Sequence, residues 1–224
     1  MSESKPVGVI GAGNFGSAVA NLLAVNSGVL LYAREPVTVE SIRRTNSNRG
    51  HKFHTNVRVT GDLAEVANTC DVIFPIVPSS HFRSMMKQLS PHLHPYHILI
   101  HGTKGLDIQL PNGTTLDEVS RLNRDQVKTM SEVICEESVV VRVGCLAGPN
   151  LAKELAAKQP AATVIASPFN EVISIGKKLL RNEEFKVYGN PDLVGVELAG
   201  ILKNIIAIAS GALSGMGYGE NARG

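Results

Sequence analysis

The stretch VGVIGAGNFGSAVANLLA, residues 7–24, carries the strongest structural signal in this chain. Four small or apolar residues predict a buried strand, and Gly11, Gly13 and Gly16 follow it at the spacing GxGxxG before a helical run. At this spacing the first glycine permits a sharp turn, the second lets a pyrophosphate approach the backbone, and the third lets the helix pack on the sheet. Free N–H groups at the helix start attract the anion. The stretch therefore predicts a dinucleotide-binding turn, with a tight turn that holds no ligand as the alternative.

Further along the chain, short β-branched runs alternate with amphipathic runs. Strands are predicted at 7–10, 29–32, 72–77, 97–101, 139–143, 162–166 and 185–188. Helices are predicted at 15–25, 37–44, 63–67, 80–89, 116–121, 151–157 and 171–180. Residues 44–56 predict a long polar loop, and Pro-Asn-Gly at 111–113 predicts a turn or hairpin tip. The alternation is typical of an α/β fold of the Rossmann type, a mostly parallel, doubly wound sheet.

From residue 193 onward the pattern is helical throughout. We therefore assign residues 1–190 to a dinucleotide-binding domain and 191–224 to the first helical part of a second domain, with NPD at 190–192 as the junction. The apolar stretch 194–217 contains Glu197, Lys203 and Asn204. These polar residues favour a helix buried in protein over a membrane span.

The composition is that of a soluble globular protein. Hydrophobic residues make up 43% of the 224 residues, and 22 basic residues nearly balance 20 acidic ones. A net charge of +2 without a basic cluster gives no reason to expect nucleic acid, and no ligand cluster predicts a metal. Cys70, Cys135 and Cys145 lack CxxC spacing, and the polar start MSESKPVG shows no signal peptide. Three buried, reduced thiols and a cytoplasmic location are expected.

The second predicted strand ends in VLLYAREP, where an acidic residue would bind the ribose hydroxyls of NAD. This chain instead places Arg34 there. A guanidinium suits a ribose phosphate, so the sequence predicts that NADP is at least tolerated. A solvated surface charge is the alternative.

Polar residues follow two later strands of the predicted sheet. Thr103 and Lys104 come directly after the strand at 97–101, and Gly148-Pro149-Asn150 precedes a helix. Open parallel sheets bind ligands in the crevice at their carboxyl ends, so these positions are candidates for ligand contacts. For each of them a plain strand-to-helix cap is the alternative.

Lys203 lies within the helical stretch ELAGILKNIIAIAS. Ala199, Gly200 and Ala207 share its helical face, and such small neighbours leave the ammonium group room to reach a ligand. The position suits a proton donor. A lysine that extends to solvent at a helix boundary is the alternative.

Six motifs occur in order: GAGNFG, VPSSHF, GTKGLD, GPNLAKEL, VYGNPDLVGVELAGILKNIIAIASG and GYGENARG. Together they closely resemble the NAD(P)-dependent sn-glycerol-3-phosphate dehydrogenases. The resemblance implies reversible reduction of a small phosphate substrate, dihydroxyacetone phosphate, to sn-glycerol 3-phosphate, a precursor of glycerophospholipids. It also implies NAD or NADP as the cofactor.

The resemblance assigns roles to individual residues. It implies that Lys203 is the catalytic lysine, the proton donor in reduction, and that Lys104 contacts both substrate and cofactor. The remaining implied substrate contacts are Gly148, Asn150 and Asn204, and the implied cofactor contacts are Gly11, Gly13, Asn14, Phe15, Gly16, Arg34, Phe82 and Ala152.

Members of the resembled family continue with a larger helical domain beyond the match to GENARG. We therefore expect residues 191–224 to be only the opening of that domain, and the chain to keep most nucleotide contacts with weak or no activity. The helix over residues 193–213 should then expose an unusually apolar face, and such a face favours a homodimer or a swapped assembly.

Two other functions are compatible with the sequence. One is a different Rossmann dehydrogenase with a helical domain, of the hydroxyacid or hydroxyacyl type, in which a histidine with an acidic partner carries the proton. His101 is the candidate histidine, and the sequence offers it no obvious acidic partner. The other is a non-catalytic module that senses the dinucleotide. Lys203→Ala separates these classes, because an enzyme would lose turnover while a sensor would hardly change.

Overall fold

The computed structural model describes residues 5–110 and 114–223, and the predicted turn at 111–113 lies outside them. Its centre is an eight-stranded sheet in the order β12-β11-β10-β7-β6-β1-β2-β5. The strands are β1 (Val7–Ile10), β2 (Val29–Tyr32), β5 (Val57–Thr60), β6 (Val72–Pro75), β7 (Ile98–His101), β10 (Arg142–Ala147), β11 (Ala161–Ala166) and β12 (Phe185–Asn190). Neighbouring strands are parallel except for β10 and β11, so the predicted Rossmann-type sheet is confirmed.

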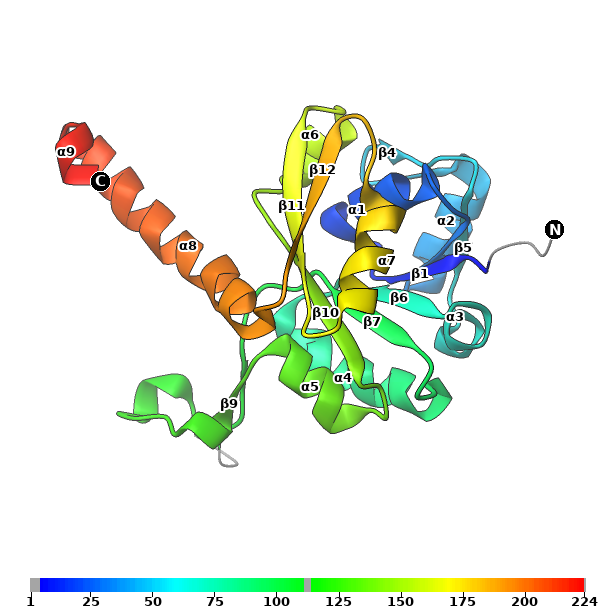
Figure 1. Ribbon diagram of the computed structural model, residues 1–224, viewed down its shortest axis with the longest axis horizontal. Coiled ribbons are helices and arrows are strands. Elements are labelled where there is room, and N and C mark those ends of the chain that lie inside the picture. The colour runs from blue at the N-terminus through cyan, green and yellow to red at the C-terminus, as the bar shows by residue number, and fades with distance from the viewer. Residues whose placement is uncertain (1–4, 111–113, 224) are drawn as a thin grey trace.

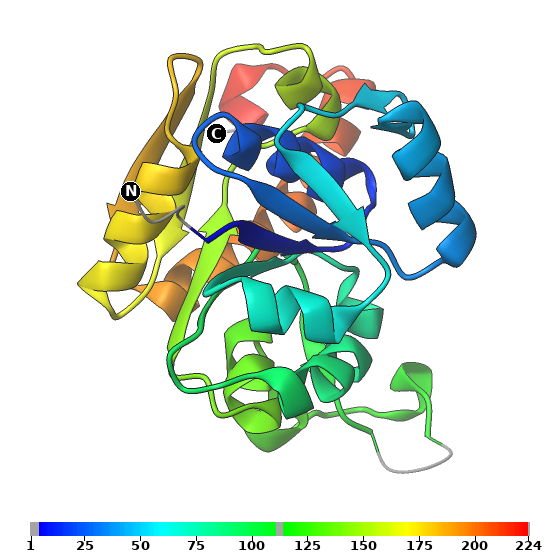
Figure 2. The same cartoon turned by 90° about the vertical axis from the view of Figure 1, so that its right-hand side faces the viewer.

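Helices cover both faces of the sheet, as Figures 1 and 2 show. On one face, the first core includes residues from α1 (Asn14–Ala24), α2 (Pro36–Thr45), α6 (Ala152–Ala156) and α7 (Asn170–Leu180). On the other, the second core includes residues from α3 (Leu63–Thr69), α4 (Ser79–Leu89) and α5 (Met130–Glu137). The sheet is therefore doubly wound, as the alternation of runs predicts.

The period of the central strands explains why both faces are covered. In β7, Ile98 and Ile100 belong to the first core while Leu99 belongs to the second. Successive side chains of a strand point to opposite faces, so a strand with no polar position must be buried on both sides. The short apolar run at 98–100 thus requires helices above and below it.

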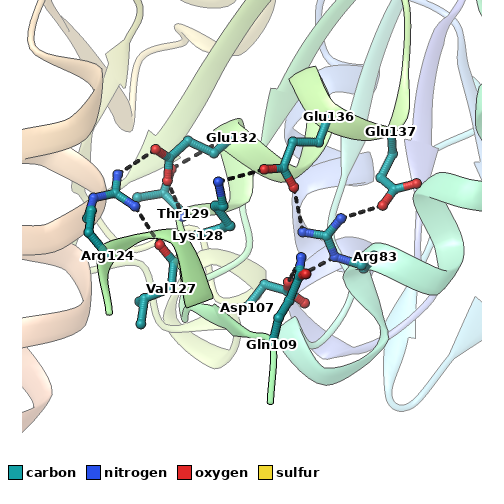
Figure 3. Close-up of polar contacts among 10 residues, drawn as sticks. All are labelled: Arg83, Asp107, Gln109, Arg124, Val127, Lys128, Thr129, Glu132, Glu136 and Glu137. Atoms are coloured by element: carbon teal, nitrogen blue, oxygen red, sulfur yellow. Dashed lines mark hydrogen bonds and ion pairs between the residues drawn. The ribbon is translucent and has the colours of Figure 1, made fainter. Parts of the chain in front are cut away.

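In the described part of the chain, four short strands lie outside the main sheet. β3 (Ser47–Asn48) pairs with β4 (His51–Lys52), and β8 (Asp107–Ile108) pairs with β9 (Val127–Lys128), both antiparallel. The segment between β7 and α5 is fixed by Arg83 on α4, whose guanidinium lies 2.9 Å from Asp107 and 2.8 Å from Glu136 and also contacts Glu137 (Figure 3). This cluster holds the chain three residues beyond Lys104.

Helix α8 (Leu193–Gly215) leaves the sheet near β10 and projects from the body of the domain, with α9 (Glu220–Arg223) at its far end (Figure 1). Asp192 caps it by accepting a 2.8 Å hydrogen bond from the backbone N–H of Gly195. Its exposed large apolar side chains are Val194, Leu198, Leu202, Ile205, Ile206 and Ile208. The predicted apolar face is confirmed.

The expectation that this stretch is buried in protein is wrong for the described residues, because Glu197 is the one buried residue of α8 among them. By length and composition alone α8 could also cross a membrane, and one such helix is weak evidence for a span.

Several boundaries differ from the prediction. The strand expected at 139–143 begins at Arg142, because Val139 and Val141 are exposed at the end of the loop before it. Residues 116–121 form only a single 3-10 turn, Leu116–Glu118. Strand β5 and helix α5 were not predicted. Cys135 on α5 is exposed, so the expectation of three buried thiols is wrong for this residue.

Candidate active site

The site lies where parallel strands end on one edge of the sheet. β1, β6, β7 and β10 all end there, and the glycine turn, Thr103–Lys104 and Gly148–Asn150 follow three of these strands directly. Ligands of open α/β sheets bind in this crevice. The structure therefore brings together loops that are far apart in the sequence.

The glycine turn has no room for side chains at two positions and open space at the third. Gly11 has φ +119°, and a Cβ there would lie 2.1 Å from the carbonyl oxygen of Ile76. A Cβ on Gly16 would lie 1.8 Å from the carbonyl oxygen of Gly11, whereas one on Gly13 meets nothing within 4 Å. Gly11 and Gly16 thus allow close packing, and Gly13 leaves a space beside the backbone that a ligand can fill.

The start of α1 is suited to an anion. Gly13 is its N-cap, no side chain of the described residues caps the helix, and the first turn has no acidic residue. The N–H groups of Asn14 and Phe15 therefore lie in the part of the helix where backbone donors lack intrahelical acceptors. Together with the space at Gly13, this arrangement fits the pyrophosphate of a dinucleotide.

Two neighbours support the turn from outside the motif. Asn48 on β3 donates a 2.7 Å hydrogen bond to the carbonyl oxygen of Ala12. The ring of Phe15 lies next to Gly102, where a Cβ would be 3.2 Å from it. The glycine turn is thereby connected to the end of β7, two residues before Lys104. Asn48 lies in the polar run 44–56, where no sequence signal distinguishes it.

The other predicted cofactor contacts differ in their placement. Arg34 is exposed after β2, and its Nε lies 3.0 Å from Glu35. Ala152 begins α6 and packs against the core that contains α1. Phe82 is completely buried, and its ring packs edge-on to that of His101 at 5.9 Å. The structure thus does not bring Phe82 to the surface of the crevice, and a direct cofactor contact by this side chain is not supported.

Lys104 and Lys203 converge on one backbone carbonyl. The Nζ atom of Lys104 lies 3.4 Å from the carbonyl oxygen of Gly148, and that of Lys203 lies 3.3 Å from the same oxygen. Burial, followed by the contact with Lys203, lowers the pKa of Lys104 to about 8. Two side chains from different elements therefore place positive charge at the end of β10.

Asn150 is held beside this carbonyl by Thr163. Its Nδ2 donates a 2.9 Å hydrogen bond to Thr163 Oγ1, which donates in turn to the carbonyl oxygen of Ala147 at 3.0 Å. Asn150 Oδ1 is buried and has no hydrogen-bond partner in the described structure. A buried acceptor without a partner is costly, so it is available to a ligand donor. Asn204 is exposed on α8.

Comparison with known proteins agrees with this geometry. The family model for the NAD-dependent glycerol-3-phosphate dehydrogenase N-terminus matches residues 6–173, and that for the C-terminus matches residues 192–224. The chain belongs to the NAD-dependent glycerol-3-phosphate dehydrogenase family. The resemblance inferred from the six sequence motifs is confirmed.

Individual relatives extend the same comparison. Glycerol-3-phosphate dehydrogenase [NAD(P)+] of Saccharophagus degradans is 36% identical over 99% of this chain and 59% of its own length. The Pseudomonas fluorescens protein of the same name is 38% identical over 100% of this chain and 62% of its own. A glycerol-3-phosphate dehydrogenase structure from Coxiella burnetii has TM-score 0.80 and 29% identity, over 98% of this chain and 64% of that one. The chain thus spans about three fifths of the length of these relatives.

In this member of the family, His101 has an acidic partner that the sequence did not reveal. Its Nε2 lies 2.9 Å from Glu197 Oε1, at an angle outside that of a regular hydrogen bond. Both side chains are almost completely buried, at 2% and 4% exposed. The expectation that His101 lacks such a partner is therefore wrong. The pair is nevertheless enclosed, so a substrate in the crevice cannot reach the imidazole directly.

Proposed function

We propose that this chain provides the dinucleotide-binding domain and the two lysines of an NAD(P)-dependent sn-glycerol-3-phosphate dehydrogenase. Its reaction is the reversible reduction of dihydroxyacetone phosphate to sn-glycerol 3-phosphate. The observation that carries the proposal is the convergence of the Lys104 and Lys203 ammonium groups, 3.4 and 3.3 Å from the Gly148 carbonyl oxygen. The names of the relatives support the assignment.

The chemistry follows from the charges in the crevice. The backbone at Gly13 and the start of α1 would hold the pyrophosphate of NAD(P)H, which would supply the hydride when bound. Negative charge then develops on the carbonyl oxygen of the substrate. The ammonium group of Lys203 stabilises this charge and donates the proton, while Lys104 adds positive potential to the same pocket. Asn150 Oδ1 accepts a hydrogen bond from a substrate hydroxyl.

The remaining assignments follow the family resemblance. Asn14, Phe15 and Ala152 contact the cofactor, and Asn204 contacts the substrate. Arg34 lets the site accept the ribose phosphate of NADP as well as NAD. The boundary between the two domains lies near residue 190, and the start of the second family model at residue 192 supports it.

We also propose a cytoplasmic homodimer that supplies glycerol phosphate for glycerophospholipid synthesis. The free thiols Cys70, Cys135 and Cys145 support a reducing compartment. The exposed apolar face of α8 supports self-association. Sedimentation velocity tests this: wild type should sediment as a dimer and Ile205→Asp as a monomer, and a monomeric wild type refutes it.

The rival dehydrogenase mechanism uses His101 as the proton donor. The burial of the His101–Glu197 pair argues against it. His101→Asn would abolish turnover under that mechanism, whereas under our proposal it should lower turnover only in part, because Lys203 still donates the proton. Lys203→Ala distinguishes the non-catalytic sensor from an enzyme, because a sensor would hardly change.

The deciding experiment measures oxidation of NADH or NADPH by dihydroxyacetone phosphate, together with dinucleotide affinity. Lys203→Ala should lower turnover by about 10²- to 10⁴-fold, the usual contribution of a positioned proton donor. The dinucleotide Kd should change less than about twofold, because Lys203 contacts Gly148 at the end of β10 and the pyrophosphate binds at the glycine turn. Turnover that survives Lys203→Ala, or a chain that binds no dinucleotide, refutes the proposal. Lys153→Ala on the exposed surface of α6 is the control.

A further inference from the structure

Helix α8 carries one buried charge, and that charge is fully engaged with the sheet domain. Glu197 Oε1 accepts a 3.0 Å hydrogen bond from the backbone N–H of Ser131, and Oε2 accepts one from the Ser131 hydroxyl. His101 at the end of β7 lies 2.9 Å from Oε1. One carboxylate therefore joins three elements: α8, the start of α5 and the end of β7.

The surroundings favour the ionised form of Glu197. Burial acts to raise the pKa of Glu197, but His101 and Ser131 outweigh it, so the pKa lies below its ordinary value. The carboxylate also lies at the N-terminus of α5, where the helix dipole favours negative charge. Its charge reaches Cys145, where burial and then Glu197 raise the thiol pKa to about 12. A buried charge with these partners is costly to displace, so it fixes α8 firmly.

The position of Glu197 on α8 determines where Lys203 lies. Val196, Glu197, Gly200 and Ile201 line a narrow hollow against the ends of β7 and β10. Lys203 follows Glu197 by six residues, about 9 Å along the helix axis. A shift or rotation of α8 on the sheet edge would carry Lys203 away from the Gly148 carbonyl.

We propose that Glu197 is a positioning residue: held by His101 and Ser131, it sets the register of α8 on the sheet edge and keeps Lys203 beside Lys104. The role as it bears on catalysis rests on the proposed function, in which Lys203 is the proton donor. The mechanical part of the role, the placement of Lys203 next to Lys104, does not depend on any substrate.

The pH dependence of Lys104 acylation reports this placement in the protein without cofactor or substrate. Trace labelling with acetic anhydride at a series of pH values, with mass spectrometry, gives the midpoint for this amine. In the wild type the midpoint should lie near 8, because burial and Lys203 lower the pKa. In Glu197→Ala, Lys203 moves away and Lys104 gains solvent, so the midpoint should rise by about 1 unit toward that of an ordinary lysine.

Three further variants test whether the shift of the Lys104 midpoint depends on the contacts of Glu197. Glu197→Gln keeps the side-chain volume and one acceptor oxygen, so its midpoint should rise less than that of the alanine variant. Ser131→Ala removes one of the contacts and should give a smaller rise. Glu40→Gln, on the exposed surface of α2, should leave the wild-type midpoint unchanged. If Glu197→Ala does not fold, the glutamine and Ser131→Ala variants provide the same measurement.

The proposal is overturned if folded Glu197→Ala has the wild-type midpoint for Lys104. If Glu197→Ala does not fold, the proposal is overturned when Glu197→Gln and Ser131→Ala both have the wild-type midpoint. In the reduction assay, Glu197→Ala should lower kcat at least about 10-fold with dinucleotide Kd unchanged, as expected for a displaced proton donor. If the midpoint moves but the wild type binds neither NADH nor NADPH, the proposed function fails while the positioning role stands.

Discussion

Alanine substitutions at Gly13 and Gly16 should separate ligand binding from folding within one turn. A Cβ on Gly13 meets nothing within 4 Å, and the residue has φ −77°, which alanine adopts without strain. As an N-cap, alanine is less favourable than glycine by at most about 1 kcal/mol. Gly13→Ala should therefore fold normally, yet its methyl group should occupy the space into which the pyrophosphate approaches. We expect the dinucleotide Kd to rise at least about 10-fold, or about 1.4 kcal/mol.

Gly16→Ala, unlike Gly13→Ala, should lower the stability of the fold. Its Cβ would lie 1.8 Å from the carbonyl oxygen of Gly11, a backbone atom that cannot move aside as a flexible side chain can. Relieving such an overlap requires the helix to move away from β1, which costs about 1–3 kcal/mol or more. For a domain of this size that corresponds to a fall in Tm of about 2–12 °C.

Thermal unfolding by circular dichroism and quenching of NADH fluorescence measure the two effects. Gly28→Ala is a matched control, because a Cβ there meets only Pro6, at 3.6 Å. If Gly13→Ala binds the dinucleotide as tightly as the wild type, the pyrophosphate does not lie at this turn. If Gly16→Ala unfolds at the wild-type temperature, the close approach of α1 and β1 is not what requires glycine there.

Three more substitutions test the surroundings of the site. Lys104→Arg should keep its affinity for the substrate phosphate above pH 8. The lysine has a pKa of about 8 and loses its charge as the pH rises through that value, whereas arginine stays charged. Titration calorimetry with dihydroxyacetone phosphate from pH 7 to 9.5 checks this, and parallel pH profiles of the two proteins contradict it. Phe82→Leu should lower the free energy of unfolding by about 1–2 kcal/mol, since the ring is fully buried. The dinucleotide Kd, measured by fluorescence titration, should not change. A large loss of dinucleotide affinity would instead indicate that Phe82 contacts the cofactor. Arg83→Met leaves partly buried carboxylates unpaired, so it should lower the free energy of unfolding in urea by about 1–3 kcal/mol. Lys5→Met removes one partner of an exposed ion pair and should leave that free energy nearly unchanged. Equal losses of stability in the two variants would contradict this prediction.

The central strands and the glycine turn are predictable because their signals are local. The run VLLY at 29–32 is apolar in every position, and the structure shows a strand over those same residues. Gly16 indicates a turn whose reason, its close approach to the backbone of Gly11, lies five residues away in the sequence. Short-range patterns of this kind locate most strands of the sheet.

The elements that were missed have weaker or different signals. Strand β5, VRVT, alternates apolar and polar residues at the edge of the sheet, and Thr60 is its one buried residue. Helix α5 lacks a clear apolar period, but its start is marked by a capping box in which Thr129 and Glu132 bond each other's backbone N–H groups. The pattern T-x-x-E could have revealed this helix.

The contact between His101 and Glu197 has no local signal, because the two residues lie on different elements and meet only when α8 packs on the ends of β7 and β10. Glu197 lies in an apolar run, where its charge suggested only that the helix does not cross a membrane. What the sequence lacked was the partner. A buried carboxylate is stable only with donors around it, so its presence in an apolar helix implies a donor elsewhere in the fold without naming it.

The nature of this contact bears on why the helix holds its lysine in place. Apolar packing alone would attach α8 to the sheet edge but would tolerate rotation or sliding, because the hydrophobic effect has no direction. Hydrogen bonds to the Ser131 N–H and hydroxyl fix both distance and direction. A displacement of α8 by one residue would leave the carboxylate of Glu197 buried without donors, which costs far more than the loss of apolar contact. The polar contact thus restricts α8 to the one register in which Lys203 reaches the Gly148 carbonyl.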